Sequence, residues 1–233
     1  QGRRLGARGG RELSQGGLSV REDLGGMPVN LLLRGRRVVV VGGGRIAARK
    51  VASLLDVGAA VEVIAPTVSS EIEALGLDGR LAVTLRPFRP ADLDGAWLAV
   101  SAADDPTVNE AVFVAGEAQR VFVNAADDPA HCSATLLSVV RRGSLQIGVG
   151  TGGRSPALAA WLREKLEAEV GPEYGTLLDL LSEQREAVRA EGRSSEDVDW
   201  REVLDSGILE LIRAGRVHEV KERLKACRTS SSG

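Results

Sequence analysis

A run of glycines directly after an apolar segment is the feature of this chain with the clearest chemistry. Residues 38–41 are four valines, residues 42–44 are three glycines, and a helix-forming stretch follows. A helix that begins in bare glycine backbone presents unpaired N–H groups and the positive end of its dipole, and both attract phosphate. The spacing Gly42-x-Gly44-x-x-Ala47 therefore fits a turn that binds the pyrophosphate of a dinucleotide.

Each position of this motif has its own role in such a turn. Gly42 makes the tight turn, Gly44 lets the pyrophosphate approach the backbone, and Ala47 permits close packing of helix on strand. The context agrees, because Val51 shares the apolar face of Ala47 over the predicted helix 46–57. A tight turn without a ligand is the alternative, but the motif in this context favours dinucleotide binding.

Two adjacent aspartates, Asp127 and Asp128, follow another short apolar run. A carboxylate on a loop beside a bound cofactor can accept a proton. Aspartates before a proline also cap loops, and from the pattern alone capping is the simpler interpretation. His131 lies four residues after Asp127, and we expect a surface or supporting histidine there.

Alternating strands and helices must position these residues. The pattern predicts strands at 38–41, 60–64, 81–85, 97–100 and 121–123, helices at 46–57, 69–75 and 107–119, and a short turn near 90–93. Such alternation is typical of a doubly wound parallel sheet of the Rossmann type, whose ligands bind beyond the carboxyl ends of the strands. Small and polar residues follow those ends, in 42–44, 65–66, 102–105 and 124–128.

The pattern changes after Asp128. The chain then predicts strands at 135–141 and 144–149, a helix at 157–170, a helix at 174–190, a polar break at 191–196 and helices through residue 225. Ser155 is the expected N-cap of the first of these helices, with Pro156 in its first turn. Leu204, Ile208 and Leu211 are expected to share one packing face near the end of the chain.

Composition excludes several classes of protein. With 43% hydrophobic and 27% charged residues, a chain of 233 residues can bury a core. A formal net charge of −2 provides no basic field for nucleic acid or an anionic membrane. Cys132 and Cys227 are too few for a disulfide framework or a zinc site, and no metal site is expected. No apolar run reaches membrane-spanning length, so we expect a cytoplasmic protein.

Residues 1–26 differ from the rest of the sequence. They are rich in glycine and arginine, lack apolar periodicity and end just before the only methionine, Met27. We predict a disordered leader or a non-native extension, with Met27 as the natural start. A basic arm for nucleic acid is disfavoured, because acidic residues interrupt the segment and it contains no aromatic residue.

Four sequence blocks, in order, resemble one enzyme family over about residues 28–169. They read VVVVGGGRIAARKVASLLDVGAAVEVIAP, WLAVSAADDPTVNEAV, VNAADDP and VVRRGSLQIGVGTGGRSPALAAWLREKLE. They are similar to precorrin-2 dehydrogenase, the dehydrogenase/ferrochelatase module of siroheme synthase. The resemblance implies an NAD-binding Rossmann domain over 27–130, a small dimerisation region over 131–170, and a helical C-terminal domain with a flexible tail over 171–233. It also implies a homodimer.

The chemistry that the resemblance implies is the oxidation of precorrin-2 to sirohydrochlorin with NAD. Several members of the family then insert ferrous iron to give siroheme. The family's catalytic aspartate matches Asp127, with Asp128 as the adjacent candidate. The ring nitrogens of the substrate hold the iron, so the lack of a His/Cys cluster is no objection.

Further site residues follow from the resemblance. The family's cofactor contacts match Gly42, Gly44, Arg45, Ile46, Ala47, Ala65, Ala102, Ala103 and Asp104. Thr151 stands where some members carry a phosphorylated serine. The substrate is rich in carboxylates, so Arg141, Arg142 and Arg154 are candidates to bind it, with a solvated basic turn as an equal alternative.

The chain departs from the usual pattern at two places. Rossmann sites often carry an acidic residue at the end of the second strand, but Glu62 comes too early for that role. The preference for NAD over NADP therefore rests on the resemblance. Residues 133–137 lack the proline and aromatic residues of many relatives. These residues would form the wall that faces the tetrapyrrole, so their absence argues against the metal-insertion step.

Three other classes of protein are alternatives to this family. A short-chain dehydrogenase needs a tyrosine and a lysine four residues apart, and Tyr174 is followed by Leu178 at that spacing. A nucleotide-sensing regulatory module would share the glycine turn but has no need of the Asp127 block. A tetrapyrrole carrier would bind pigment without reducing NAD. No second glycine-rich nucleotide site follows Glu169, so we expect precorrin-2 to come from another protein.

Overall fold

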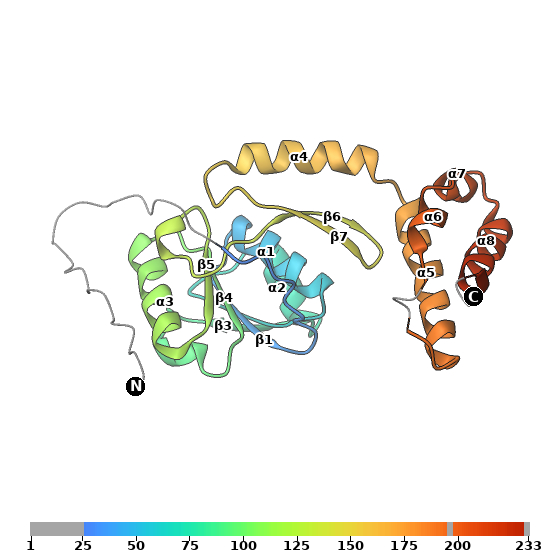
Figure 1. The fold of residues 1–233 in the computed structure, drawn as a ribbon. Coiled ribbons are helices and arrows are strands. Elements are labelled where there is room, and N and C mark those ends of the chain that lie inside the picture. The colour runs from blue at the N-terminus through green and yellow to red at the C-terminus, as the bar shows by residue number, and fades with distance from the viewer. Residues whose placement is uncertain (1–25, 195–197, 231–233) are drawn as a thin grey trace, which may run out of the picture. The chain divides into compact units, whose positions relative to one another are not determined.

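The computed structural model describes residues 26–194 and 198–230 (Figure 1). The chain forms two compact units, Gln1–Ser133 and Ala134–Gly233, which we describe one at a time. Apart from Gly26, the leader predicted over residues 1–26 lies outside the described residues. The same holds for residues 195–196 of the predicted polar break and for the last three residues of the tail.

The first unit contains a parallel sheet with the strand order β3-β2-β1-β4-β5. Its strands are β1 (Arg37–Val41), β2 (Ala60–Ala65), β3 (Ala82–Leu85), β4 (Leu98–Ser101) and β5 (Phe122–Ala125). Its helices are α1 (Arg45–Asp56), α2 (Ser70–Leu77), α3 (Pro106–Gln119) and the short 3-10 turns η1 (Pro90–Leu93) and η2 (Pro129–His131). The predicted α/β fold is confirmed, and the bounds of these elements differ from the prediction by a residue or two.

Strand β1 is fully enclosed, because both faces of the sheet are covered. Val38 and Val40 belong to the core that α1 and α2 complete, whereas Val39 belongs to the core that α3 completes. All three valines have 0% exposure. A continuous run of β-branched residues is typical of a parallel strand buried on both faces, which explains why this segment was readable from the sequence.

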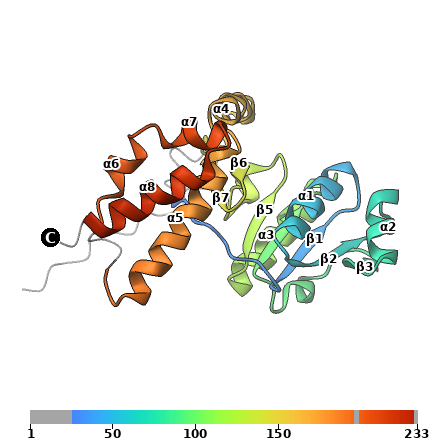
Figure 2. The same ribbon diagram turned by 90° about the vertical axis from the view of Figure 1, so that its right-hand side faces the viewer.

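The second unit begins with a hairpin and continues as helices. It contains β6 (Ser138–Arg142) antiparallel to β7 (Leu145–Val149), then α4 (Pro156–Glu169), α5 (Glu173–Ala190), α6 (Trp200–Leu204), α7 (Ile208–Arg213) and α8 (Val217–Ser230). Helix α4 lies along the hairpin and contacts both strands (Figure 1). Helices α5 to α8 pack together around an apolar core of their own (Figure 2).

Two predictions for the second unit need correction. Strand β6 begins at Ser138 rather than at residue 135, and the side chains of residues 135–137 are exposed. Leu204 is 39% exposed and does not share the core face of Ile208. The reason is that α6 ends at Leu204, and Gly207, with a φ of +77°, redirects the chain before α7.

The N-cap prediction for α4 is confirmed. The Ser155 hydroxyl accepts a hydrogen bond from the Leu158 amide at 3.2 Å, and Pro156 occupies the first helical turn. Among the described residues, none of the helices is both long enough and apolar enough to cross a membrane.

Candidate active site at the carboxyl edge of the sheet

The strand order creates a crevice at the carboxyl edge of the sheet. Strands β1 and β4 are neighbours, yet β1 continues toward β2 on one side and β4 toward β5 on the other. The loops after β1 and β4 therefore leave in opposite directions, and ligands of open α/β sheets bind at such a switch point. The loops at this edge are residues 42–44 after β1, 102–105 after β4 and 126–128 after β5.

Gly42 is required by its surroundings. Its φ is +119°, a value that favours glycine. A Cβ atom placed on Gly42 would lie 2.4 Å from the carbonyl oxygen of Ala102, so the backbones of the two loops touch. This close approach fixes one wall of the crevice against the other.

Gly43 is equally constrained, and the sequence motif did not single it out. Its Cβ would lie 1.9 Å from the carbonyl oxygen of Thr67, on the loop after β2. The Gly43 carbonyl also accepts a hydrogen bond from the Ser69 amide at 2.8 Å. The motif treats this position as variable, and the signal that could have revealed it is the run of three glycines.

Gly44 has the opposite environment. A Cβ on Gly44 would meet nothing within 4 Å. Gly44 is the N-cap of α1, and no side chain of the described residues caps the helix or places an acidic group in its first turn. Open space in front of uncapped amides at the positive end of a helix fits a phosphate group, as the dinucleotide prediction requires.

The next residues of α1 alternate between the crevice and the core. Arg45 is exposed and Ile46 is 36% exposed, whereas Ala47 is fully buried against the sheet. Of the cofactor contacts that the resemblance implies, Arg45 and Ile46 can thus reach a ligand with their side chains. Ala47 acts through close packing of helix on strand.

The remaining predicted cofactor contacts lie on the same edge. Ala65 ends β2 and is 3% exposed. Ala102 and Ala103 are half-buried after β4, and Asp104 is exposed. Asp105 caps α3 by accepting a hydrogen bond from the Thr107 amide at 2.9 Å.

Glu62, the acidic residue of β2, is not positioned to bind the ribose of a dinucleotide. Glu62 forms an ion pair of 2.7 Å with Arg37 and accepts a hydrogen bond from Thr84 at 3.1 Å. It is paired across the sheet with Val39, whereas Ile64 lies beside Val41, the last residue of β1. The expectation that Glu62 comes too early is therefore confirmed.

Asp127 follows β5 in a left-handed conformation, with a φ of +57°. Its side chain is exposed, and within the described part of the chain the carboxylate makes no hydrogen bond to protein. Non-glycine residues adopt such backbone angles infrequently, because this conformation costs of order 1–3 kcal/mol. Residues held in it are found mostly in functional loops.

The buried thiol of Cys132 holds this loop in place. Its sulfur accepts from the Ala125 amide at 3.2 Å and lies 3.3 Å from the Ala125 carbonyl and 3.4 Å from the Asp128 carbonyl. Burial raises the pKa of Cys132, and the Ala125 amide offsets this only in part. The group is therefore a neutral thiol that braces the turn and not a nucleophile.

Asp128 has a partner of its own. Its carboxylate lies 2.7 Å from Nδ1 of His131, and the histidine ring packs edge-on against Phe113, with 5.7 Å between centroids. Of the two expected roles for His131, these contacts fit a supporting residue. Because Asp128 is engaged in this pair, Asp127 is the carboxylate that is available to a ligand.

Lys50 was not predicted as a site residue, but the fold places it near this loop. Burial lowers the pKa of Lys50, with a further contribution from Arg49, while Asp127 and Cys132 act in the opposite direction. The charge of Asp127 therefore acts on the ammonium group of Lys50, although Lys50 lies on α1, 77 residues earlier in the chain. No local sequence signal links the two.

The candidate substrate contacts Arg141, Arg142 and Arg154 lie in the second unit. Arg141 and Arg154 are exposed. Arg142 donates hydrogen bonds of 2.7 Å to the carbonyls of both Glu167 and Val170, at the carboxyl end of α4. Arginine in such a position satisfies helix carbonyls that lack a partner within the helix.

Thr151 also lies in this second unit. Its hydroxyl is 3.2 Å from both the amide and the carbonyl of Ser155, so it closes the turn before α4.

Comparisons with known proteins agree with this architecture. Residues 29–138 match a family model described as "Putative NAD(P)-binding", and residues 142–169 match one described as "Sirohaem biosynthesis protein central". The siroheme synthase of Nitrosococcus oceani is 36% identical over 86% of this chain, and that of Pseudomonas entomophila is 38% identical over 86%. The matches cover 43% and 44% of those proteins, so the chain spans less than half their length.

A solved structure gives the fuller match. The protein is SirC, a precorrin-2 dehydrogenase, with 31% identity and a TM-score of 0.69. The match covers 87% of this chain and 99% of SirC, so it includes both the sheet and the second unit. The chain therefore belongs to the family of SirC and of the matching part of the siroheme synthases.

Proposed function

We propose that this chain oxidises precorrin-2 to sirohydrochlorin with NAD, in siroheme biosynthesis. The observation that carries this proposal is a glycine turn built for a phosphate and an available carboxylate on one sheet edge, in a relative of SirC. Neither feature alone is specific. Together they provide what removal of a hydride and a proton from a reduced tetrapyrrole requires.

The cofactor would be held mainly by backbone. Gly42 and Gly43 keep the turn closed, Gly44 leaves room for the pyrophosphate, and Arg45 can add a charge at its edge. The other half of a dinucleotide would lie over residues 102–104. NAD, when bound, accepts the hydride.

Asp127 is the proposed general base. Oxidation removes two hydrogens from precorrin-2, one as a hydride and one as a proton, and the carboxylate of Asp127 takes the proton. The Cys132 thiol and the Asp128–His131 pair hold the loop that presents it.

Basic side chains would bind the acidic groups of the substrate. Lys50 is the candidate for this role in the first unit, where the crevice lies. Arg141 and Arg154 of the second unit are exposed, and they remain candidates through the family resemblance. We leave Arg142 out of this set, because its guanidinium is already bound to the end of α4.

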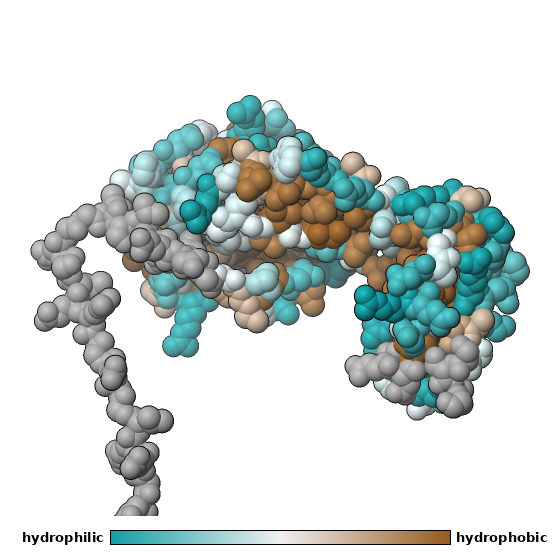
Figure 3. All heavy atoms as spheres, turned by 45° about the horizontal axis from the view of Figure 1, so that its top comes forward, coloured by the Kyte–Doolittle hydropathy of each residue, from teal (hydrophilic) through white to brown (hydrophobic). Residues whose placement is uncertain are grey.

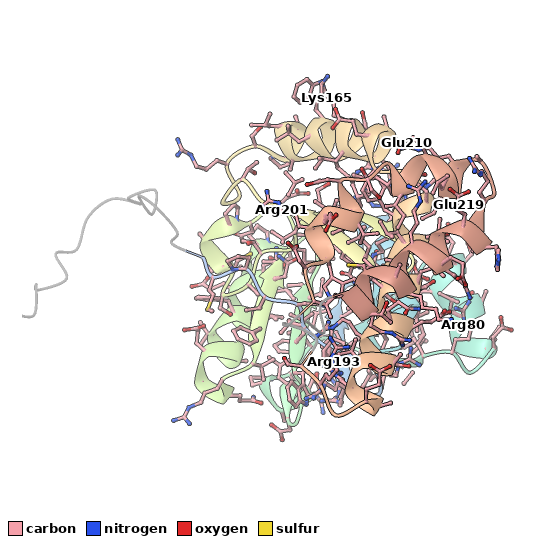
Figure 4. The ribbon with its side chains drawn as sticks, turned by 45° about the vertical axis from the view of Figure 1, so that its right-hand side comes forward. Arg80, Lys165, Arg193, Arg201, Glu210 and Glu219 are labelled. Atoms are coloured by element: carbon pink, nitrogen blue, oxygen red, sulfur yellow. The ribbon has the colours of Figure 1, made fainter. Side chains whose placement is uncertain are left out.

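A homodimer is part of the proposal, formed through residues 131–170. Apolar side chains gather on the surface in the region of β6, β7 and α4 (Figure 3). Leu136, Leu137, Leu158 and Trp161 are 46%, 37%, 48% and 53% exposed. Exposed apolar surface of this kind marks interfaces. Lys165 points away from the hairpin (Figure 4), and its ammonium group lies over the Trp161 ring, 4.6 Å from the ring centroid.

Further parts of the proposal rest on the resemblance. Ferrous iron would be a second substrate, with Asp127 taking protons from the pyrrole nitrogens as the metal enters. The Thr151 hydroxyl would become accessible to phosphorylation when its turn opens. A reducing, cytoplasmic setting agrees with Cys132 and Cys227, which are thiols and not joined in a disulfide within the described residues.

Anaerobic turnover tests the proposal. The purified chain is mixed with precorrin-2 and NAD, and the absorbance of NADH and of sirohydrochlorin is recorded. We expect the two products in equal amounts. Absence of both, while SirC assayed in parallel converts its substrate, would contradict the proposal; pigment binding without NADH would identify a carrier instead.

A further inference from the structure

A buried polar pair lies directly beneath the proposed cofactor crevice. Ser101, the last residue of β4, is 0% exposed, and Asn109, in the first turns of α3, is 6% exposed. The Ser101 hydroxyl donates to Oδ1 of Asn109 at 2.5 Å. Both side chains are polar groups taken out of water, a cost that proteins accept where the groups are hydrogen-bonded.

The pair continues to the loop above it. Because the amide oxygen of Asn109 accepts from Ser101, its Nδ2 is left to donate, and it does so to the carbonyl of Ala103 at 3.4 Å. Asn109 is thus tied to β4 through one end of its amide and to the cofactor loop through the other.

The same residues lie where three loops meet. The backbone of Ala102 touches Gly42, and the Ala102 amide donates to Val41 at 2.8 Å. The Ser101 carbonyl accepts from the Ala126 amide at 2.7 Å, next to Asp127. A shift of residues 102–103 would therefore also move the glycine turn and the start of the loop that carries Asp127.

We propose that Asn109, supported by Ser101, is a positioning residue for the nicotinamide half of the cofactor. This inference rests on the proposed function. In a dinucleotide site the pyrophosphate lies at the helix N-terminus and the adenosine ribose at the end of the second strand, so the other half extends over β4. The Ala103 carbonyl that Asn109 fixes belongs to that part of the crevice.

This arrangement predicts a split between two ligands. ADP needs the glycine turn and the end of β2, whereas NAD needs residues 102–104 as well. Loss of the Asn109 amide should raise the Kd for NAD about tenfold and leave the Kd for ADP within about twofold, since one loop contact typically accounts for that much.

The test uses a single and a double variant. Asn109→Leu removes both hydrogen bonds and leaves the Ser101 hydroxyl buried without its partner, so we expect lower stability and weaker NAD binding. Ser101→Ala with Asn109→Leu makes the pair apolar, and replacing both partners restores much of the stability. We expect NAD binding to stay weak in the double variant. A purely structural role would let stability and binding recover together.

A matched control comes from another buried polar residue. Asp92, in η1, is 8% exposed and hydrogen-bonded to Arg86 at 2.6 and 2.8 Å. Asp92→Ala should lower stability without changing the Kd for NAD. Ser101→Ala alone, the mildest change, should weaken NAD binding slightly and ADP binding not at all.

Two calorimetric outcomes would overturn the inference. One is a double variant that binds NAD as tightly as the unmodified chain does. The other is a variant of Asn109 in which the Kd values for NAD and for ADP rise by the same factor. If the double variant does not fold, Ser101→Ala decides by the same comparison of NAD with ADP. Absence of NAD binding by the unmodified chain would instead refute the proposed function itself.

Discussion

The substitution Gly44→Ala separates folding from cofactor binding. Gly44 has φ −82° and ψ −171°, a conformation open to any residue, and a Cβ there would touch nothing within 4 Å. The variant should therefore fold as the original does. Removing a glycine also restricts the unfolded chain, so its stability should be unchanged or raised by about 0.4–1 kcal/mol.

Binding of NAD to Gly44→Ala should be weaker than binding to the original chain. The new methyl group would stand in the open space that a pyrophosphate must enter to reach the uncapped amides of α1. Displacing the phosphate from one such hydrogen bond costs about 1.5–3 kcal/mol. This corresponds to a rise in the Kd for NAD of roughly ten- to hundredfold.

Gly43→Ala is the matched control for this prediction. Its Cβ would lie 1.9 Å from the Thr67 carbonyl, so the backbone must move and the variant should lose stability as well as affinity. Urea denaturation and titration calorimetry with NAD measure the two effects. Wild-type NAD affinity in Gly44→Ala would refute the assignment of this turn to the pyrophosphate.

Three further predictions concern stability and assembly. Arg142→Ala should lower the free energy of unfolding by about 1–3 kcal/mol, because the last carbonyls of α4 lose their partner; an unchanged urea midpoint would contradict this. Arg86 holds the pKa of the Asp92 carboxyl below its ordinary value of 3.8, so the ionised pair adds stability at neutral pH that is lost as the pH falls below about 4. The difference in urea midpoint between the original chain and Asp92→Asn should therefore shrink from neutral pH to about pH 3, and a constant difference would count against the pair. Trp161→Glu should yield monomers in sedimentation velocity runs, and a dimer that survives the change would exclude this face as the interface.

The sheet was predictable because its signals are local. Four valines in a row before glycines indicate a strand buried on both faces, and the structure has Val38, Val39 and Val40 at 0% exposure. The turn at Gly42 and the open space at Gly44 also follow from a short motif. The alternation of strands and helices along the chain predicts parallel strands. The loops that follow these strands then lie together at the carboxyl edge of the sheet.

What sequence reasoning missed depends on contacts between distant segments. Lys50 and Cys132 gain their significance only when α1 lies near the loop after β5. Arg142 has the charge expected of a substrate contact, but the sequence does not show that the end of α4 returns to its guanidinium. The importance of Asn109 likewise requires knowing that α3 places it under residues 102–103.

The most direct test of the account compares the original chain with Asp127→Asn. Asparagine tolerates the left-handed backbone of this position, so the loop and the Kd for NAD should be unchanged. Anaerobic oxidation of precorrin-2 by the variant should slow by at least about a hundredfold, as expected for loss of a general base. Oxidation at the original rate by Asp127→Asn would contradict the account.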